Sequence, residues 1–446
     1  MRHGGRGRAA LRPLLALTLC LGALLLARPP AAFAGAAPAR APQAAPGAAD
    51  AIAVTASAAK PEFPKSITFT LTARGTAADI VKVQLFYRPV AAAITELAAP
   101  DFTPGREVTA TAAIDMTEHY LPPGIDVQYY WSLTDAAGNH LDTAPQQFLY
   151  QDQRFPWRTK QGGQVTVYYY SGNDDFGQDI LDTALRAADR LGHSFGVAGN
   201  RPIHIVVYGN NRDFASSLPP NSAEWIGGQA HPDLGLIVTG IQPGSGAAAE
   251  IRRVIPHEMS HQLLYQATDN PYGGPPHWLD EGLAVYNQET PDSEFSTMLQ
   301  QAIRNGTLIP VRALNSNFPL DPDQALLSYA ESLSVVQFIV KTYGDAKLGQ
   351  LLTSFKDELS YDEALQAALG VDTDGLDRAW KASLGYKGDR AGATLDGPRA
   401  PGDGIGRAAN NGPATLATIA IPIAALALIA AGGLALRRRG GVGRGA

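Results

Sequence analysis

The segment that most constrains this chain reads His257-Glu258-Met259-Ser260-His261, and it stands within the first long helical pattern of the sequence. Residues four apart on an α-helix share one face, so both imidazoles can reach a single metal ion. Glu258 then lies close enough to act on a water molecule at that metal. With nine histidines among 446 residues, this pattern arises by chance at a rate on the order of one in a hundred. A buried helix with two ordinary histidines is therefore the weaker hypothesis.

The composition limits which ligands such a metal can have. Cys20 is the only cysteine, which excludes a disulfide scaffold and a zinc site built on thiolates. Histidines and carboxylates must therefore supply the ligands. A carboxylate on a second helix is the usual third ligand when two histidines share one helix turn, and the fourth position stays open for water. Such a carboxylate follows His261 in Trp278-Leu279-Asp280-Glu281-Gly282-Leu283-Ala284.

Together these two motifs resemble those of the gluzincin metallopeptidases, specifically the peptidase MA-like domains, whose HExxH is followed by W-L-x-E-G-x-A. The resemblance extends loosely over residues 160 to 384. It implies a zincin-type domain that hydrolyses peptide bonds and binds one Zn²⁺ per chain through His257, His261 and Glu281. It also implies that Glu258 is the general base for a zinc-bound water.

Neighbouring residues distinguish this pattern from related ones. Asp280 is a second candidate ligand, but Gly282 follows Glu281 as the gluzincin pattern requires. Leu264 and Ala267 stand where metzincins need a glycine and a histidine, which excludes that family.

Two further side chains are candidates for the same site. In gluzincins a downstream tyrosine often donates a hydrogen bond to the oxyanion, and the resemblance gives this catalytic role to Tyr329. The alternative is that Tyr329 simply packs among apolar neighbours. His277 lies four residues before Glu281 and would share its helix face. It either supports the ligand or contacts substrate, or it is a capping or surface histidine.

Two local features bear on the geometry around the motif. Pro256 removes a backbone donor, so we expect a kink near Arg252 unless the helix starts after it. The strand expected at Gly235–Gly240 resembles the edge strand on which zincins bind the substrate backbone.

The chain between its two ends predicts two folded domains. Short alternating segments between turns, over residues 51–152, indicate an all-β sandwich that resembles the immunoglobulin or fibronectin type III class. From Gln164 onward strands and helices alternate and then helices alone follow, which predicts the α+β zincin-type metallopeptidase domain over 160–384. The expected strands lie at 66–72, 81–88, 108–114, 127–134, 147–150, 165–170, 203–208 and 235–240, and the first helix lies at 179–191.

The two ends predict export and anchoring. Residues 1–34 are typical of a secretory signal peptide, with an uncleaved anchor as the alternative. Residues 414–436 carry no charge and precede three arginines, which predicts a single transmembrane helix with a cytoplasmic basic tail at 437–446. An apolar core helix is the alternative there. Linkers are expected at 35–50, rich in Ala and Pro, and at 385–413.

Charge limits the class of partner. The formal net charge is −6, but neither end contains an acid, and the stretch 35–436 has 27 basic against 42 acidic residues. Such an acidic stretch argues against nucleic-acid binding. The sequence therefore predicts a cell-membrane zinc metallopeptidase with its N-terminal ectodomain outside, acting on a peptide or protein substrate. The alternatives are a non-catalytic zincin scaffold for adhesion or binding, and a protease that processes itself or neighbouring membrane proteins.

Overall fold

The computed structural model describes residues 51–219, 226–388 and 419–422 of the chain. The predicted signal peptide at 1–34, the linker at 35–50 and the basic tail at 437–446 lie outside the described residues. Most of the second predicted linker, 385–413, lies outside them as well.

The N-terminal part is built from two antiparallel sheets that share one core. Alternate residues of the second strand, including Phe69 and Leu71, are buried with Leu85 and Trp131 of the other sheet. This alternation explains the sandwich, because each sheet buries one face. One sheet contains β1 (Ile52–Glu62), β2 (Ser66–Gly75) and β5 (Glu107–Asp115); the other contains β3 (Ile80–Pro89), β4 (Glu96–Ala98), β6 (Ile125–Asp135), β7 (His140–Asp142) and β8 (Gln146–Tyr150).

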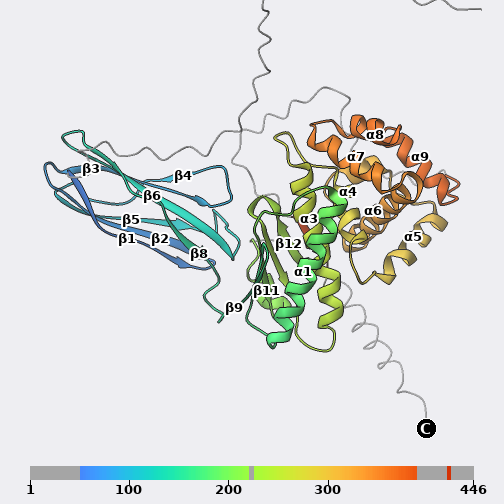
Figure 1. Ribbon diagram of the computed structural model, residues 1–446, viewed down its shortest axis with the longest axis horizontal. Helices are drawn as coiled ribbons and strands as arrows, with labels where there is room; N and C mark the ends of the chain where they lie inside the picture. Colours follow the sequence, from blue (N-terminus) through green and yellow to red (C-terminus); the bar gives the residue numbers. More distant parts are fainter. Residues whose placement is uncertain (1–50, 220–225, 389–418, 423–446) are drawn as a thin grey trace, which may run out of the picture. The chain divides into compact units, whose positions relative to one another are not determined.

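The second part contains a mixed sheet in the order β14-β12-β13-β11-β10-β9. Strands β10, β11 and β13 run parallel, whereas β9, β12 and β14 pair antiparallel to their neighbours. One face of the sheet, including Ile205 and Ile237, packs in the same core as α1 and α3 (Figure 1). The strands are β9 (Arg158–Gly162), β10 (Val165–Tyr169), β11 (Ile203–Tyr208), β12 (Ile226–His231), β13 (Leu236–Gly240) and β14 (Ile419–Pro422).

The strand that we predicted as the substrate edge is not at the edge. Gly235–Gly240 corresponds to β13, which lies between β11 and β12. Strand β12, which pairs with β13 on one side and with β14 on the other, is absent from the sequence prediction, because Gly227, Gly228 and two polar residues interrupt the alternation that marks a strand. The place of β12 in the sheet is therefore set by its pairing with β13 and β14 and not by strand propensity.

Helices make up the rest of this part. The first expected helix, 179–191, is longer in the structure because Asn173 caps it by accepting the N–H of Phe176. Helix α3 is buried on every side from Val254 to Leu264, as expected for a central helix. The helices are α1 (Asp174–Phe195), α2 (Asn211–Ala215), α3 (Ala247–Thr268), α4 (His277–Tyr286), α5 (Ser293–Asn305), α6 (Pro322–Tyr343), α7 (Asp345–Lys356), α8 (Tyr361–Leu369) and α9 (Thr373–Ser383).

The predicted transmembrane helix at 414–436 lies mostly outside the described residues. Its four described residues form β14, a strand paired antiparallel with β12, so the helix prediction is wrong for Ile419–Pro422. Branched isoleucines favour extended backbone, and proline disfavours helix at the residue that precedes it. Among the described residues, no helix is both long enough and apolar enough to cross a membrane.

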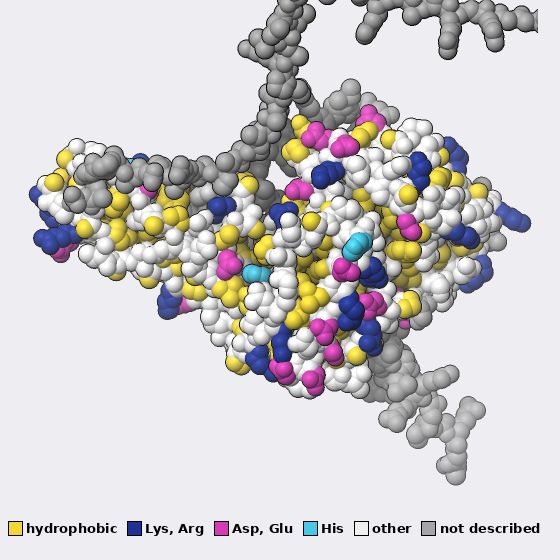
Figure 2. All heavy atoms as spheres, in the orientation of Figure 1, with side chains coloured by type: hydrophobic (Ala, Val, Ile, Leu, Met, Phe, Trp, Pro, Cys, Tyr) yellow, Lys and Arg dark blue, Asp and Glu magenta, His cyan; other side chains and the backbone are white. Residues whose placement is uncertain are grey.

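Charged side chains are mixed on the surface. On the face drawn in Figure 2, Lys and Arg side chains are interspersed with Asp and Glu side chains instead of gathering by sign. Exposed ion pairs in the structure include those of Arg312 with Asp362 and Asp374. Exposed pairs of this kind contribute little to stability, roughly 0–1 kcal/mol each.

Candidate metal centre

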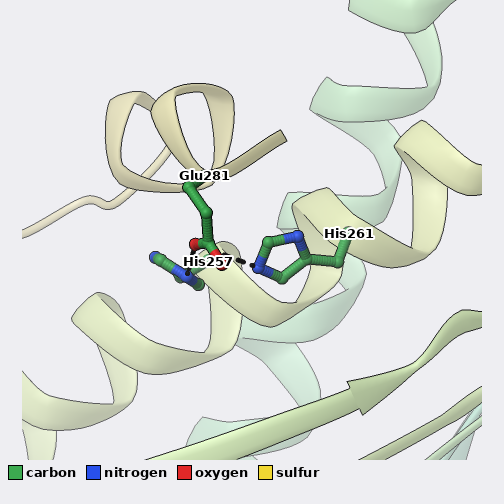
Figure 3. A group of neighbouring side chains, drawn as sticks. All are labelled: His257, His261 and Glu281. Carbon is green, nitrogen blue, oxygen red and sulfur yellow. Dashed lines mark ion pairs between the residues drawn. The ribbon is translucent and has the colours of Figure 1, made fainter. Parts of the chain in front are cut away.

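Three buried side chains converge between α3 and α4. His257 and His261 project from α3, and Glu281 reaches them from α4 (Figure 3). Glu281 Oε2 lies 3.5 Å from His257 Nε2 and 3.7 Å from His261 Nε2. One ligand atom from each residue lies within 4.8 Å of the others. The structure thus brings together all three side chains that the sequence proposes as ligands.

The spacing suits a zinc ion. Zinc ligands at roughly 2.0–2.2 Å in tetrahedral geometry stand about 3.3–3.6 Å apart, close to the separations of Glu281 from both histidines. The Nε2 atoms of His257 and His261 are buried and have no hydrogen-bond partner among the described residues. Buried polar atoms without a partner cost free energy unless something binds them. Two imidazoles and a carboxylate also form a common catalytic zinc set.

Gly282 explains how α4 brings Glu281 to the metal centre. A β-carbon on Gly282 would lie 2.6 Å from the carbonyl oxygen of Ser332 on α6. Only glycine permits this approach of the two helix backbones. The Glu-Gly pair of the motif therefore combines a ligand with the close packing that positions it.

Each histidine has a partner on its Nδ1 atom. Asp280 Oδ1 lies 2.6 Å from His261 Nδ1, and Gln288 Nε2 lies 3.0 Å from His257 Nδ1. Such partners fix the ring orientation and direct Nε2 to the metal. Asp280 is therefore placed as a support for a ligand. Gln288 is missing from the sequence prediction, although it follows Glu281 by seven residues, about two helical turns.

Glu258 is fully buried, and both of its carboxylate oxygens lack a hydrogen-bond partner among the described residues. It stands directly against β12, because a β-carbon on Gly228 would lie 2.2 Å from Glu258 Oε1. An unpaired carboxylate beside this strand is placed to exchange a proton with a molecule bound along β12.

Tyr329 and His277 both lie beside Glu281. Tyr329 is buried on α6, and its hydroxyl interacts with the Glu281 carboxyl. His277 Nε2 lies 3.8 Å from Glu281 Oε1, so the expected shared helix face is present. Phe318 stands between the two rings, 4.5 Å from His277 and 5.0 Å from Tyr329 by ring centroids.

Burial dominates the electrostatics of this cluster. Burial raises the pKa of Glu258 to about 8 and that of Glu281 to about 8. It also lowers the pKa of His257 well below its ordinary value. Burial lowers the pKa of His261 too, but the charges of Asp280 and Glu281 outweigh it and raise the pKa to about 10. The metal-free site therefore retains protons that a bound cation would displace.

A family model described as the Peptidase MA superfamily matches residues 183–386, which include all of these side chains. Over this stretch the chain is similar to the Peptidase MA superfamily. The resemblance to a peptidase MA-like domain is confirmed by this match over residues 183–386, and the three converging side chains fit Zn²⁺.

Solved structures similar to this chain include an M1 zinc metallopeptidase from Deinococcus radiodurans. It is 15% identical, with a TM-score of 0.36, and the match covers 72% of this chain and 90% of that one. An aminopeptidase N family protein from Idiomarina loihiensis is 10% identical, with a TM-score of 0.35 and coverage of 73% and 74%. TM-scores this low do not establish a common overall arrangement. No curated protein matches the sequence.

Proposed function

We propose that the protein hydrolyses peptide bonds outside the cytoplasmic membrane, with Glu258 as the general base. The observation that carries this proposal is the position of Glu258, buried and unpaired between the three converging side chains and β12. A zinc ion held by His257, His261 and Glu281 supplies a Lewis acid that polarises a peptide carbonyl and acidifies water.

The residues of the chain then have separate tasks. Substrate backbone pairs along β12 in place of β14, which occupies that side of β12 in the structure, and its scissile carbonyl then passes Gly228. Glu258 takes a proton from the attacking water and passes it to the leaving amine. Tyr329, which already reaches Glu281, donates a hydrogen bond to the oxygen on which negative charge develops.

The variant Glu258→Gln tests this mechanism. Glutamine keeps the size of the side chain but cannot accept the proton, so we expect hydrolysis of a generic protein substrate to fall by at least about 100-fold. Zinc content and folding should stay near those of the unmodified protein. Peptide cleavage at an unchanged rate would show that Glu258 is not the base.

Glu281→Gln is the matched comparison, because it makes the same chemical change in a side chain that we place on the metal. This variant should lose zinc as well as activity, since it removes a charged ligand. If both variants and the unmodified protein retain zinc and cleave nothing, the non-catalytic scaffold becomes the better hypothesis.

We also propose that the chain is held at the membrane by the segment 414–436, with its N-terminal part outside. Support comes from the absence of charge over these 23 residues and from Arg437, Arg438 and Arg439, which resist translocation. Strand β14 belongs to this segment, so anchoring requires Ile419–Pro422 to leave the edge of β12. Protease added to intact cells should degrade the ectodomain and spare a C-terminal tag, whereas loss of the tag would contradict this topology.

A further inference from the structure

The two ligand histidines are supported by chemically different groups. His261 faces the carboxylate of Asp280 in the first turn of α4, and His257 faces the carboxamide of Gln288 just after the end of α4. Both contacts are made through Nδ1, so both rings present Nε2 to Glu281. Helix α4 therefore supplies one ligand, and α4 and the residues that follow it also supply the support for the other two.

Pro256 accounts for the position of Gln288. A proline has no N–H, so the carbonyl of Arg252 lacks its partner four residues along α3. The N–H of Glu289 fills that place, with its nitrogen 3.0 Å from Arg252 O. Pro256 thus leaves the carbonyl of Arg252 free to accept a hydrogen bond from outside α3, and the backbone N–H of Glu289 donates it.

Hydrogen bonds of Asn287 also hold the residues that follow α4. The carbonyl of Asn287 accepts a hydrogen bond from Arg190 of α1 at 2.9 Å, and its side chain donates to Leu283 O at 2.8 Å. Together with the bond from Glu289 N–H to Arg252 O, these bonds of Asn287 fix the backbone on both sides of Gln288. Its carboxamide is therefore held against His257 by the chain around it.

The nitrogen and the oxygen of the Gln288 carboxamide differ in what they offer His257, because the nitrogen donates a hydrogen bond and the oxygen accepts one. A histidine that binds zinc through Nε2 carries its proton on Nδ1 and needs an acceptor there. Gln288 Nε2 faces His257 Nδ1, while Gln288 Oε1 is buried without a partner among the described residues. A half-turn of the carboxamide places Oε1 at His257 Nδ1 and satisfies both atoms.

We propose that Gln288 is a positioning residue for the metal centre, which holds His257 in the tautomer and orientation that bind zinc by accepting the Nδ1 proton through Oε1. A neutral amide polarises His257 less than the Asp280 carboxylate polarises His261. Zinc affinity is consequently limited on the His257 side and responds to the chemistry at position 288.

The test is the zinc dissociation constant of the full chain, measured by competition with a chromophoric chelator after metal removal. Gln288→Leu keeps the approximate volume but removes the acceptor, so we expect the constant to rise about 10- to 100-fold. Gln288→Glu restores an acceptor with a charge, and its constant should equal or fall below that of the unmodified protein. An unchanged constant in Gln288→Leu, or equal weakening in both variants, would overturn the proposal.

Gln262→Leu is the control, because Gln262 is another buried glutamine on this core whose Nε2 donates to Leu236 O at 2.9 Å. It should lower the melting temperature without changing the zinc constant. The measurement does not require peptidase activity. If Glu258→Gln cleaves peptides normally while Gln288→Leu still weakens zinc, the proposed catalytic role fails and the positioning role stands.

Discussion

The α-carbon of Gly228 lies so close to Glu258 that a β-carbon on it would stand 2.2 Å from Glu258 Oε1. Strand β12 and the Glu258 carboxylate are therefore in contact through a residue with no side chain. The same β-carbon would lie 3.4 Å from Thr239 Oγ1 on β13, so it has little room to shift away. Glycine at this position allows substrate backbone and Glu258 to meet.

Gly228→Ala should separate the strand from the carboxylate. A displacement of about 1 Å at a catalytic group can cost on the order of 100-fold in rate, so we expect kcat/KM to fall by about that factor with normal zinc content. Gly349→Ala on α7 is the control, because a β-carbon there meets nothing within 4 Å. Full activity in Gly228→Ala would show that Glu258 does not need this contact.

Gly282→Ala should destabilise the packing of α4 on α6. The added carbon would stand 2.6 Å from Ser332 O, and a backbone oxygen cannot turn aside as a side chain can. Overpacking of this kind costs roughly 1–3 kcal/mol, which thermal unfolding would detect as a lower melting temperature. Because Glu281 precedes the substituted residue, zinc should also bind more weakly. A stable variant with normal zinc affinity would contradict this account of the motif.

Tyr329→Phe separates catalysis from packing at this position. The ring and its contact with Phe318, at 5.0 Å between centroids, remain in the variant. Only the hydroxyl that reaches Glu281 is lost. Removal of one donor to a developing oxyanion costs about 100- to 1,000-fold in kcat, and we expect a decrease of that order with unchanged melting temperature. An unchanged kcat would mean that Tyr329 serves packing alone.

The buried carboxyl of Glu331, which lies outside the metal centre, makes the free energy of unfolding depend on pH. Its side chain is fully buried on α6, and its carboxylate accepts the N–H of Ile309 at 3.0 Å. Burial raises its pKa from 4.5 to about 8. Between these values the folded chain binds a proton that the unfolded chain has released, so stability falls as pH rises through this window.

Glu331→Gln should remove this contribution to the pH dependence of stability. Glutamine keeps an acceptor for Ile309 and carries no charge, so the variant should be more stable than the unmodified protein near pH 8. The difference should be on the order of a few kcal/mol at most and should disappear near pH 4. Denaturant unfolding across this range measures it, and parallel pH profiles for both proteins would contradict the prediction.

The sequence alone determined the parts of this protein that depend on local periodicity. Alternation located β2, β3, β5 and β6, because a half-buried strand must show its buried face every second residue. The i, i+4 spacing of His257 and His261 placed both rings on one helix face. The third ligand required a second motif, since Glu281 comes from another helix and its role was implied only by the family resemblance.

Only the tertiary structure decided which strand is outermost and which groups support the ligands. The order of β12 and β13 depends on pairing between distant segments, and the glycines of β12 carry no strand signal of their own. Gln288 meets His257 because Pro256 leaves the Arg252 carbonyl open to the N–H of Glu289. Local sequence cannot reveal such contacts, because each depends on where the fold places a backbone group far away along the chain.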